Sequence, residues 1–87
     1  MENCMSFPVV TDENQSVQVE LRKEKDENSP TPPQWNLLQR VNGQNEEIIL
    51  YQGPCEVAIR LLCKILEEGK IPPEGIWEKW VDFYTYK

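Results

Sequence analysis

The sequence predicts an α+β fold: a small three-stranded, mostly antiparallel sheet packed against a central buried helix and a short aromatic C-terminal helix. Three observations support this fold class. Apolar and polar residues alternate strictly over residues 16–22, which is typical of a half-buried strand. An Asn-Gly pair at positions 42 and 43 separates two further strand-like stretches, and this pair is a strong hairpin signal. Two stretches with helical periodicity follow, each introduced by proline.

The chain of 87 residues has the length of one domain. Residues 1–15 are polar apart from residues 7–10 and show no sustained periodicity, so we expect a flexible or loosely docked N-terminal arm. The single domain then spans residues 16–87. Within it, residues 23–34 combine many charges with three prolines, which predicts an exposed connector rather than a helix or a central strand.

The predicted strands span residues 16–22, 35–41 and 46–51. A loop of two residues, or a loop of four over residues 42–45, joins the last two strands, and both lengths give the same alternation of faces. The side chains expected to point into the core are Val17, Val19, Leu21, Leu37, Val41, Ile48 and Leu50. The opposite face is expected to carry Leu38, Ile49 and Tyr51, with an ion pair between Arg40 and Glu47.

The first predicted helix has Gly53 as its N-cap and Pro54 at its first position, and it ends at Gly69. Its apolar residues occupy an arc of roughly 200°, wider than the ~100° stripe of a helix lying on one surface, so we expect it to be covered on two sides. The second helix runs from Pro73 to about residue 84. The centre of its apolar arc is expected to supply the second cover, through Ile76, Trp80 and Phe83.

Composition limits the classes of function. Fifteen acidic and nine basic residues give a net charge of −6, which disfavours direct binding to nucleic acid or to anionic membranes. No stretch approaches the roughly 20 apolar residues of a membrane span, and the first residues lack the pattern of a secretory signal. We therefore expect a soluble, cytoplasmic protein that does not bind membranes.

Cysteine and histidine usage argues against a metal site or a cofactor. The chain has no histidine, and its three cysteines, Cys4, Cys55 and Cys63, show no C-x-x-C spacing. Cys55 is the sharpest candidate nucleophile, because a thiol in the first turn of a helix lies near the positive end of the dipole. No histidine is present to act as its base, so a small buried apolar side chain is the favoured interpretation.

The acidic pairs Glu46-Glu47 and Glu67-Glu68 are interpreted as solvated surface charge. Neighbouring residues point to opposite faces of a strand and diverge by about 100° on a helix, so neither pair converges on one site. The sequence thus predicts no catalytic, cofactor-binding or metal-binding residues, and we expect a protein that is not an enzyme.

The aromatic residues concentrate at the C-terminal end, where five of the eight lie within the last eleven positions. Part of this cluster is needed for a small core, but tryptophan and tyrosine are also enriched at the centres of protein interfaces. The flank of the second helix and two further aromatics form the predicted partner-binding surface: Trp77, Tyr84, Val81, Tyr86 and Trp35.

The leading hypothesis is a small, acidic, non-enzymatic protein-binding module. It would act as an accessory or regulatory subunit of a larger protein assembly, through the aromatic flank or through an exposed strand edge. One alternative is an acidic inhibitor that mimics nucleic acid toward a basic nucleic-acid enzyme. The other is a thiol-dependent redox protein that uses Cys55. Self-association into a homo-oligomer is left open.

Overall fold

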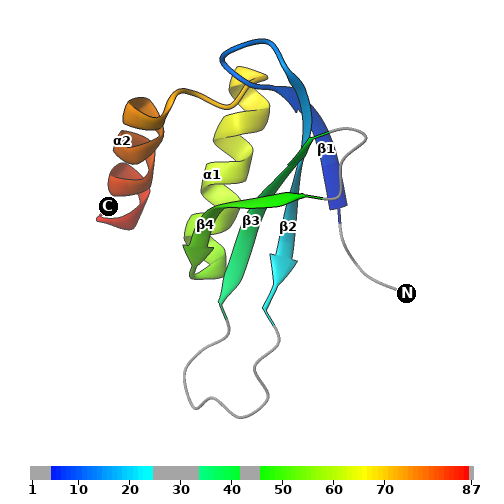
Figure 1. Cartoon of the computed structure of the whole chain (residues 1–87). Helices are drawn as coiled ribbons and strands as arrows, with labels where there is room; N and C mark the ends of the chain where they lie inside the picture. Colours follow the sequence, from blue (N-terminus) through cyan, green and yellow to red (C-terminus); the bar gives the residue numbers. More distant parts are fainter. Residues whose placement is uncertain (1–4, 25–33, 42–45, 87) are drawn as a thin grey trace.

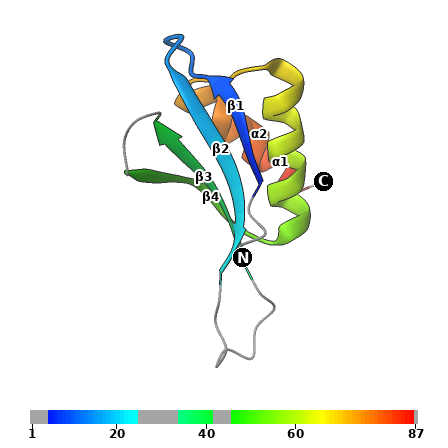
Figure 2. The same ribbon diagram turned by 90° about the vertical axis from the view of Figure 1, so that its right-hand side faces the viewer.

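The computed structural model describes residues 5–24, 34–41 and 46–86. Its strands form one antiparallel sheet in the order β1-β2-β3-β4. Helix α1 packs across one face of this sheet with α2 beside it, as Figures 1 and 2 show. The α+β class with an antiparallel sheet and two helices is therefore confirmed. The elements are β1 (Met5–Val10), β2 (Ser16–Lys23), β3 (Trp35–Val41), β4 (Glu47–Gly53), α1 (Cys55–Glu68) and α2 (Glu74–Thr85).

The sheet has four strands rather than the three predicted. The additional strand is β1, which comes from the segment expected to be an N-terminal arm and pairs antiparallel with β2. A short turn joins the two strands, in which the backbone N–H of Thr11 donates to the carbonyl of Gln15 at 2.9 Å. Pro8 interrupts the apolar pattern of β1 in the sequence. An edge strand tolerates proline, because one of its sides forms no ladder hydrogen bonds.

The other three strands begin within one residue of the predicted positions. Alternation in β2 places Val17 and Val19 in the core, where they are 1% and 0% exposed. Most of the predicted connector, residues 25–33, lies outside the described residues, as does the predicted turn at residues 42–45.

The β3–β4 hairpin contains a bulge that changes one predicted face. Near the turn, Arg40 lies opposite Glu47, which is the register of the four-residue loop. The register then shifts after Leu38, so that Leu37 lies opposite Tyr51 and Leu50 has no partner in β3. The extra residue turns Tyr51 toward the core, so its predicted place on the opposite face is wrong.

The core lies between the sheet and α1. Both layers contribute side chains that are almost completely removed from water. Burial of each such side chain stabilises the fold by roughly 1.5–3 kcal/mol. The buried cluster consists of Val9, Val17, Val19 and Leu37 from the sheet, Leu61, Leu62 and Ile65 from α1, and Ile71 from the segment between the helices.

Helix α1 begins one residue later than predicted and ends where the sequence indicates. Pro54 is its N-cap rather than its first residue. At the other end Gly69 has a φ of 80°, in the left-handed region that favours glycine, and its backbone N–H donates to the carbonyl of Ile65 at 2.8 Å.

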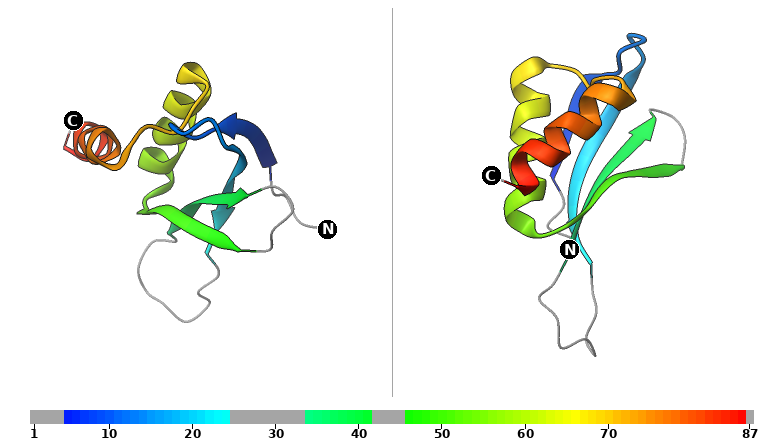
Figure 3. Two further views of the ribbon diagram at one scale, coloured as in Figure 1. Left: turned by 45° about the horizontal axis from the view of Figure 1, so that its top comes forward. Right: turned by 90° about the vertical axis from the view of Figure 1, so that its left-hand side faces the viewer.

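The expected cover on two sides of α1 is incomplete. The sheet covers the face that carries Ala58, Leu61 and Ile65, each 0% exposed. Helix α2 lies along a flank of α1, on the side away from β1 in Figure 3. Ile59 and Leu66 nevertheless keep 43% and 40% of their surfaces exposed, so one end of the wide apolar arc stays in contact with water.

The segment between the helices is tied to the sheet. The backbone N–H of Ile71 donates to the carbonyl of Val10 at 2.8 Å, and Lys70 forms a parallel bridge with Val10. Helix α2 then starts after Pro73, whose carbonyl accepts from the N–H of Trp77 at 2.9 Å. Neither helix in the described part of the chain is long and apolar enough to cross a membrane.

Two isoleucines of α1 test where the core lies. We expect Ile65→Ala to lower the free energy of unfolding by about 2–5 kcal/mol, because it removes a fully buried side chain and leaves a cavity. Ile59→Ala, in the same helix but 43% exposed, should cost less than about 1 kcal/mol. Denaturant unfolding measures both values, and equal losses would contradict the packing described above.

Candidate functional site

The predicted partner-binding residues on α2 lie closer to the core than expected. Trp77, Val81 and Tyr84 are partly buried and pack against the core cluster. The indole N–H of Trp77 also donates to the backbone carbonyl of Leu50 at 3.1 Å. This bond attaches α2 to the bulge of β4, so Trp77 has a clear structural role.

The two remaining predicted residues lie apart from these three. Trp35 is half-buried at the start of β3, where it pairs with Lys23 and Gly53 of the neighbouring strands. Tyr86 follows α2 and is 84% exposed. The five predicted residues therefore do not form one continuous surface, and their part in partner binding remains a prediction.

Helix α2 exposes two residues that were expected in the core. Ile76 is 45% exposed and Phe83 is 57% exposed. They are seven residues apart, which places them on the same side of the helix. The face that packs inward is centred on Trp77 and Tyr84 instead of Trp80, because the bond from Trp77 to β4 fixes the rotation of the helix. The predicted packing of Ile76 and Phe83 is therefore wrong.

Lys64 links α1 to the aromatic residues of α2. Its ammonium group lies 5.6 Å from the centre of the Trp80 ring, within the range of a cation–π interaction. The same group contacts Glu68 at 3.3 Å and Glu67 at 3.7 Å. The hydrogen bond to Glu68 raises the pKa of Lys64 above its usual value, with smaller contributions from nearby charges.

The face of the sheet opposite the helices carries a network of four charged side chains. The Arg22 guanidinium contacts Glu20 at 2.6 Å and Glu47 at 3.0 Å. Arg40 also pairs with Glu47, which confirms the ion pair predicted from the alternation of faces. Hydrogen bonds from Arg22 and then Arg40 lower the pKa of Glu47. Because two acids meet two bases, the network has no net charge.

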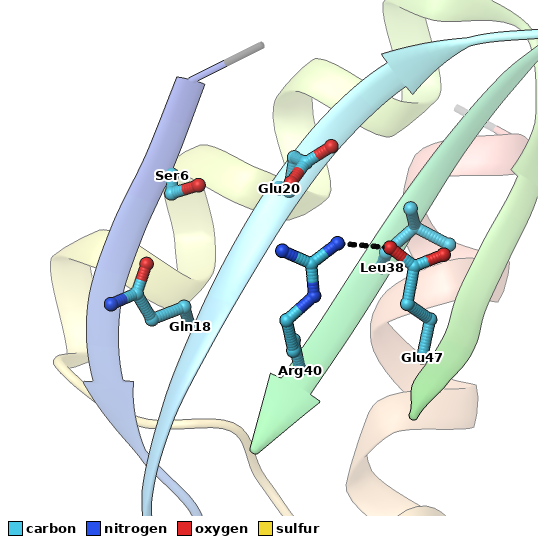
Figure 4. A pocket seen from close by; sticks show the side chains of 6 residues that line it. All are labelled: Ser6, Gln18, Glu20, Leu38, Arg40 and Glu47. Atoms are coloured by element: carbon cyan, nitrogen blue, oxygen red, sulfur yellow. Dashed lines mark hydrogen bonds and ion pairs between the residues drawn. The ribbon is translucent and has the colours of Figure 1, made fainter. Parts of the chain in front are cut away.

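A shallow hollow lies beside this network, as Figure 4 shows. Its volume is about 10 Å³, which is room for about one water molecule. Glu20 lies in its wall and is only 8% exposed, and Arg22 compensates the buried charge with hydrogen bonds at 2.6 and 2.8 Å. The hollow is far smaller than a pocket for an organic ligand. Its lining residues are Ser6, Gln18, Glu20, Leu38, Arg40 and Glu47.

The candidate groups for thiol and carboxylate chemistry are dispersed. Cys55 is half-buried at the start of α1 and Cys63 is exposed on the same helix, and both are free thiols. In the described ranges no three carboxylate or thiol side chains are arranged to hold a metal ion. On α1, Glu56 pairs with Arg60 at 3.1 Å. Arg60 and Lys64 thus separate Glu56 from Glu67 and Glu68 on this helix, whereas a mimic of nucleic acid needs an uninterrupted acidic face.

Comparison of the chain with protein-family models, with curated proteins and with solved structures gives no match. In the described residues, large apolar side chains are exposed on three elements. Ile59 and Leu66 on α1 are the least exposed of them, and the more exposed ones lie on two further elements. One is α2, and the other is β4, where Ile48 is 47% exposed and Ile49 is 56% exposed.

The sequence predicted Tyr86 and an exposed strand edge as binding features, but it placed Ile76, Phe83 and Ile48 in the core, and these three are 45%, 57% and 47% exposed. A helical wheel gives the arc of apolar residues on α2 but not the direction from which its neighbours approach. The apolar residues at the edge of that arc, Trp77 and Val81, turned out to face the core. On β4, three consecutive apolar residues from Ile48 to Leu50 break strict alternation, and this signal already indicates apolar side chains on both faces of a strand.

The charged network predicts a pH dependence of stability. The folded-state pKa of Glu47 lies below its usual value, so its interactions stabilise the protein at neutral pH and are lost as the pH falls through the folded-state pKa. We expect Glu47→Gln to lower the free energy of unfolding at pH 7 and to have little effect at strongly acidic pH. Denaturant titrations at several pH values measure the difference. Glu78→Gln, at an exposed position on α2, is the control and should show no comparable change.

Proposed function

We propose that this protein is a small, non-enzymatic protein-binding module that serves as an accessory or regulatory subunit of a larger, cytoplasmic assembly. The observation that carries the proposal is the exposed apolar surface at the C-terminal end. It consists of Ile76 and Phe83 on one side of α2 and of Tyr86 directly after the helix, which are 45%, 57% and 84% exposed. We call these three residues the α2 surface.

The α2 surface suits a protein contact for three reasons. Helix α2 packs against the core cluster through Trp77, Trp80, Val81 and Tyr84, which leaves 45% of Ile76 and 57% of Phe83 exposed. Large apolar side chains that share one side of a helix are the anchors used in helix-mediated recognition. The Phe83 ring meets the Tyr84 ring edge to face, with centroids 5.1 Å apart, so an exposed aromatic side chain of this surface contacts one that packs against the core.

Overall charge supports a protein partner over a polyanion. The net charge of −6 repels phosphate backbones and favours approach to a neutral or basic protein surface. The ion pairs on α1 and on the sheet face opposite the helices form within the chain, so these acids are already paired with bases. The contact is accordingly expected to be apolar and resistant to salt, whereas binding by an acidic mimic would weaken steeply as salt is added.

The test is affinity capture from the source cell with the tagged protein, at low and at high salt. We expect a stoichiometric protein partner that survives high salt. Ile76→Ser combined with Phe83→Ser should weaken its binding by about tenfold or more, because anchors at interfaces contribute about 2 kcal/mol or more each. Unfolding of the free variant should remain cooperative.

The matched control is Ile59→Ser on α1, an isoleucine with 43% exposure outside the α2 surface, which should leave capture unchanged. Two results would contradict the proposal. A partner released by salt would favour the acidic mimic, and equal losses with both sets of variants would place the contact elsewhere.

A further inference from the structure

The two edges of the sheet are protected very differently. An unpaired edge strand is a template for pairing with another chain, and proteins usually block such edges with proline, charge, bulges or covering segments. On β1, Pro8 removes one backbone donor from the middle of the strand. The segment after α1 bonds to its end, through Ile71 N–H and the carbonyl of Val10 at 2.8 Å. This edge is therefore partly closed.

Strand β4 forms the other edge and is protected over only part of its length. Within the described part of the chain β4 pairs with β3 alone, and Figures 1 and 3 show no element along its outer side. From Leu50 onward the bulge and the Trp77 indole interrupt the edge. The stretch from Glu47 to Ile49 has no proline and no lysine, and its one acid pairs with Arg22 of β2 and Arg40 of β3.

Two exposed isoleucines on this stretch indicate which kind of partner segment can cover the edge. Ile48 is 47% exposed and Ile49 is 56% exposed. Consecutive residues of a strand point to opposite faces of the sheet. A helix or loop docked on one face therefore covers only one of them. A segment that runs alongside β4 as a further strand covers both at once and also satisfies the backbone groups of the edge.

We propose that the β4 edge at residues 47–49 accepts an extended strand from another protein, with apolar side chains on both faces and no net negative charge. A second copy of this chain is the less favourable occupant, because each copy carries a net charge of −6, and like charges of this size oppose association. Glu47 is already neutralised by Arg22 and Arg40. The incoming strand thus meets an apolar edge within an acidic protein. This surface is separate from the α2 surface, and each can fail without the other.

The probe is a blocked peptide of sequence Lys-Thr-Val-Ile-Val-Thr-Lys, added at up to millimolar concentration to the isotopically labelled full chain. We expect amide resonances of residues 47–50 to shift and their hydrogen exchange to slow. A peptide with the same side chains but N-methyl groups on its three central residues lacks the central backbone donors that would pair with residues 47–49, so it should not bind. Replacing both lysines of the peptide by glutamate should weaken binding, because the protein is acidic.

Two variants of the protein locate the site. Ile49→Lys places a charge on the edge and should weaken binding of the peptide about tenfold or more, since natural edges use lysine to prevent pairing. Ile59→Lys changes the same residue type at similar exposure on α1 and should bind normally. Dispersed amide spectra of both free variants establish that they are folded.

Four results would overturn this inference: no binding of the unmodified peptide, equal binding of its N-methylated form, resonance shifts centred away from β4, or equal effects of the two variants. Sedimentation of the free protein distinguishes a strand from another protein from a second copy of this chain as the occupant of the edge. A dimer that is abolished by Ile49→Lys would assign the edge to a second copy. Loss of peptide binding in the Phe83 variant alone would instead implicate the α2 surface.

Discussion

The contact between α1 and the inner face of the sheet is the constraint on which the rest of the structure depends. Leu61 and Ile65 of the helix are fully buried against a sheet face that carries Val19 and Leu37, which are also 0% exposed. A domain of this length buries a limited share of its surface, so this single layer of apolar side chains must supply most of the hydrophobic stabilisation. The remaining elements attach to it. β1 extends the sheet that α1 covers, and α2 lies along a flank that the sheet leaves open.

Much of this arrangement follows from the sequence, because it depends on local patterns. Alternation from Val17 to Leu21 specifies β2 and the face it buries, and Gly69 specifies the end of α1 through a backbone conformation that favours glycine. The pairing of Arg40 with Glu47 follows from the same alternation. These features require no knowledge of which distant segment is the neighbour.

The features that could not be predicted depend on such neighbours. Pro8 is acceptable in β1 only because that strand lies at an edge, and the position of the strand in the sheet is not a local property. The rotation of α2 depends on where the Trp77 indole finds an acceptor, and that acceptor, Leu50, is 27 residues away in a bulge. Ile76 and Phe83 were therefore expected in the core but lie on the surface, and they form part of the candidate binding surface.

The bulge at Leu50 also limits how the length of the chain can vary. The extra residue of β4, Leu50, turns Tyr51 toward the core. Its backbone carbonyl also accepts the hydrogen bond from the Trp77 indole. Removing or adding a residue within β4 would reverse the faces beyond that point and detach the C-terminal helix at the same time. Insertions in the connections between elements change neither the faces of β4 nor the attachment of α2. Relatives of this protein should therefore differ in the lengths of their loops while keeping the residue count of β4 constant.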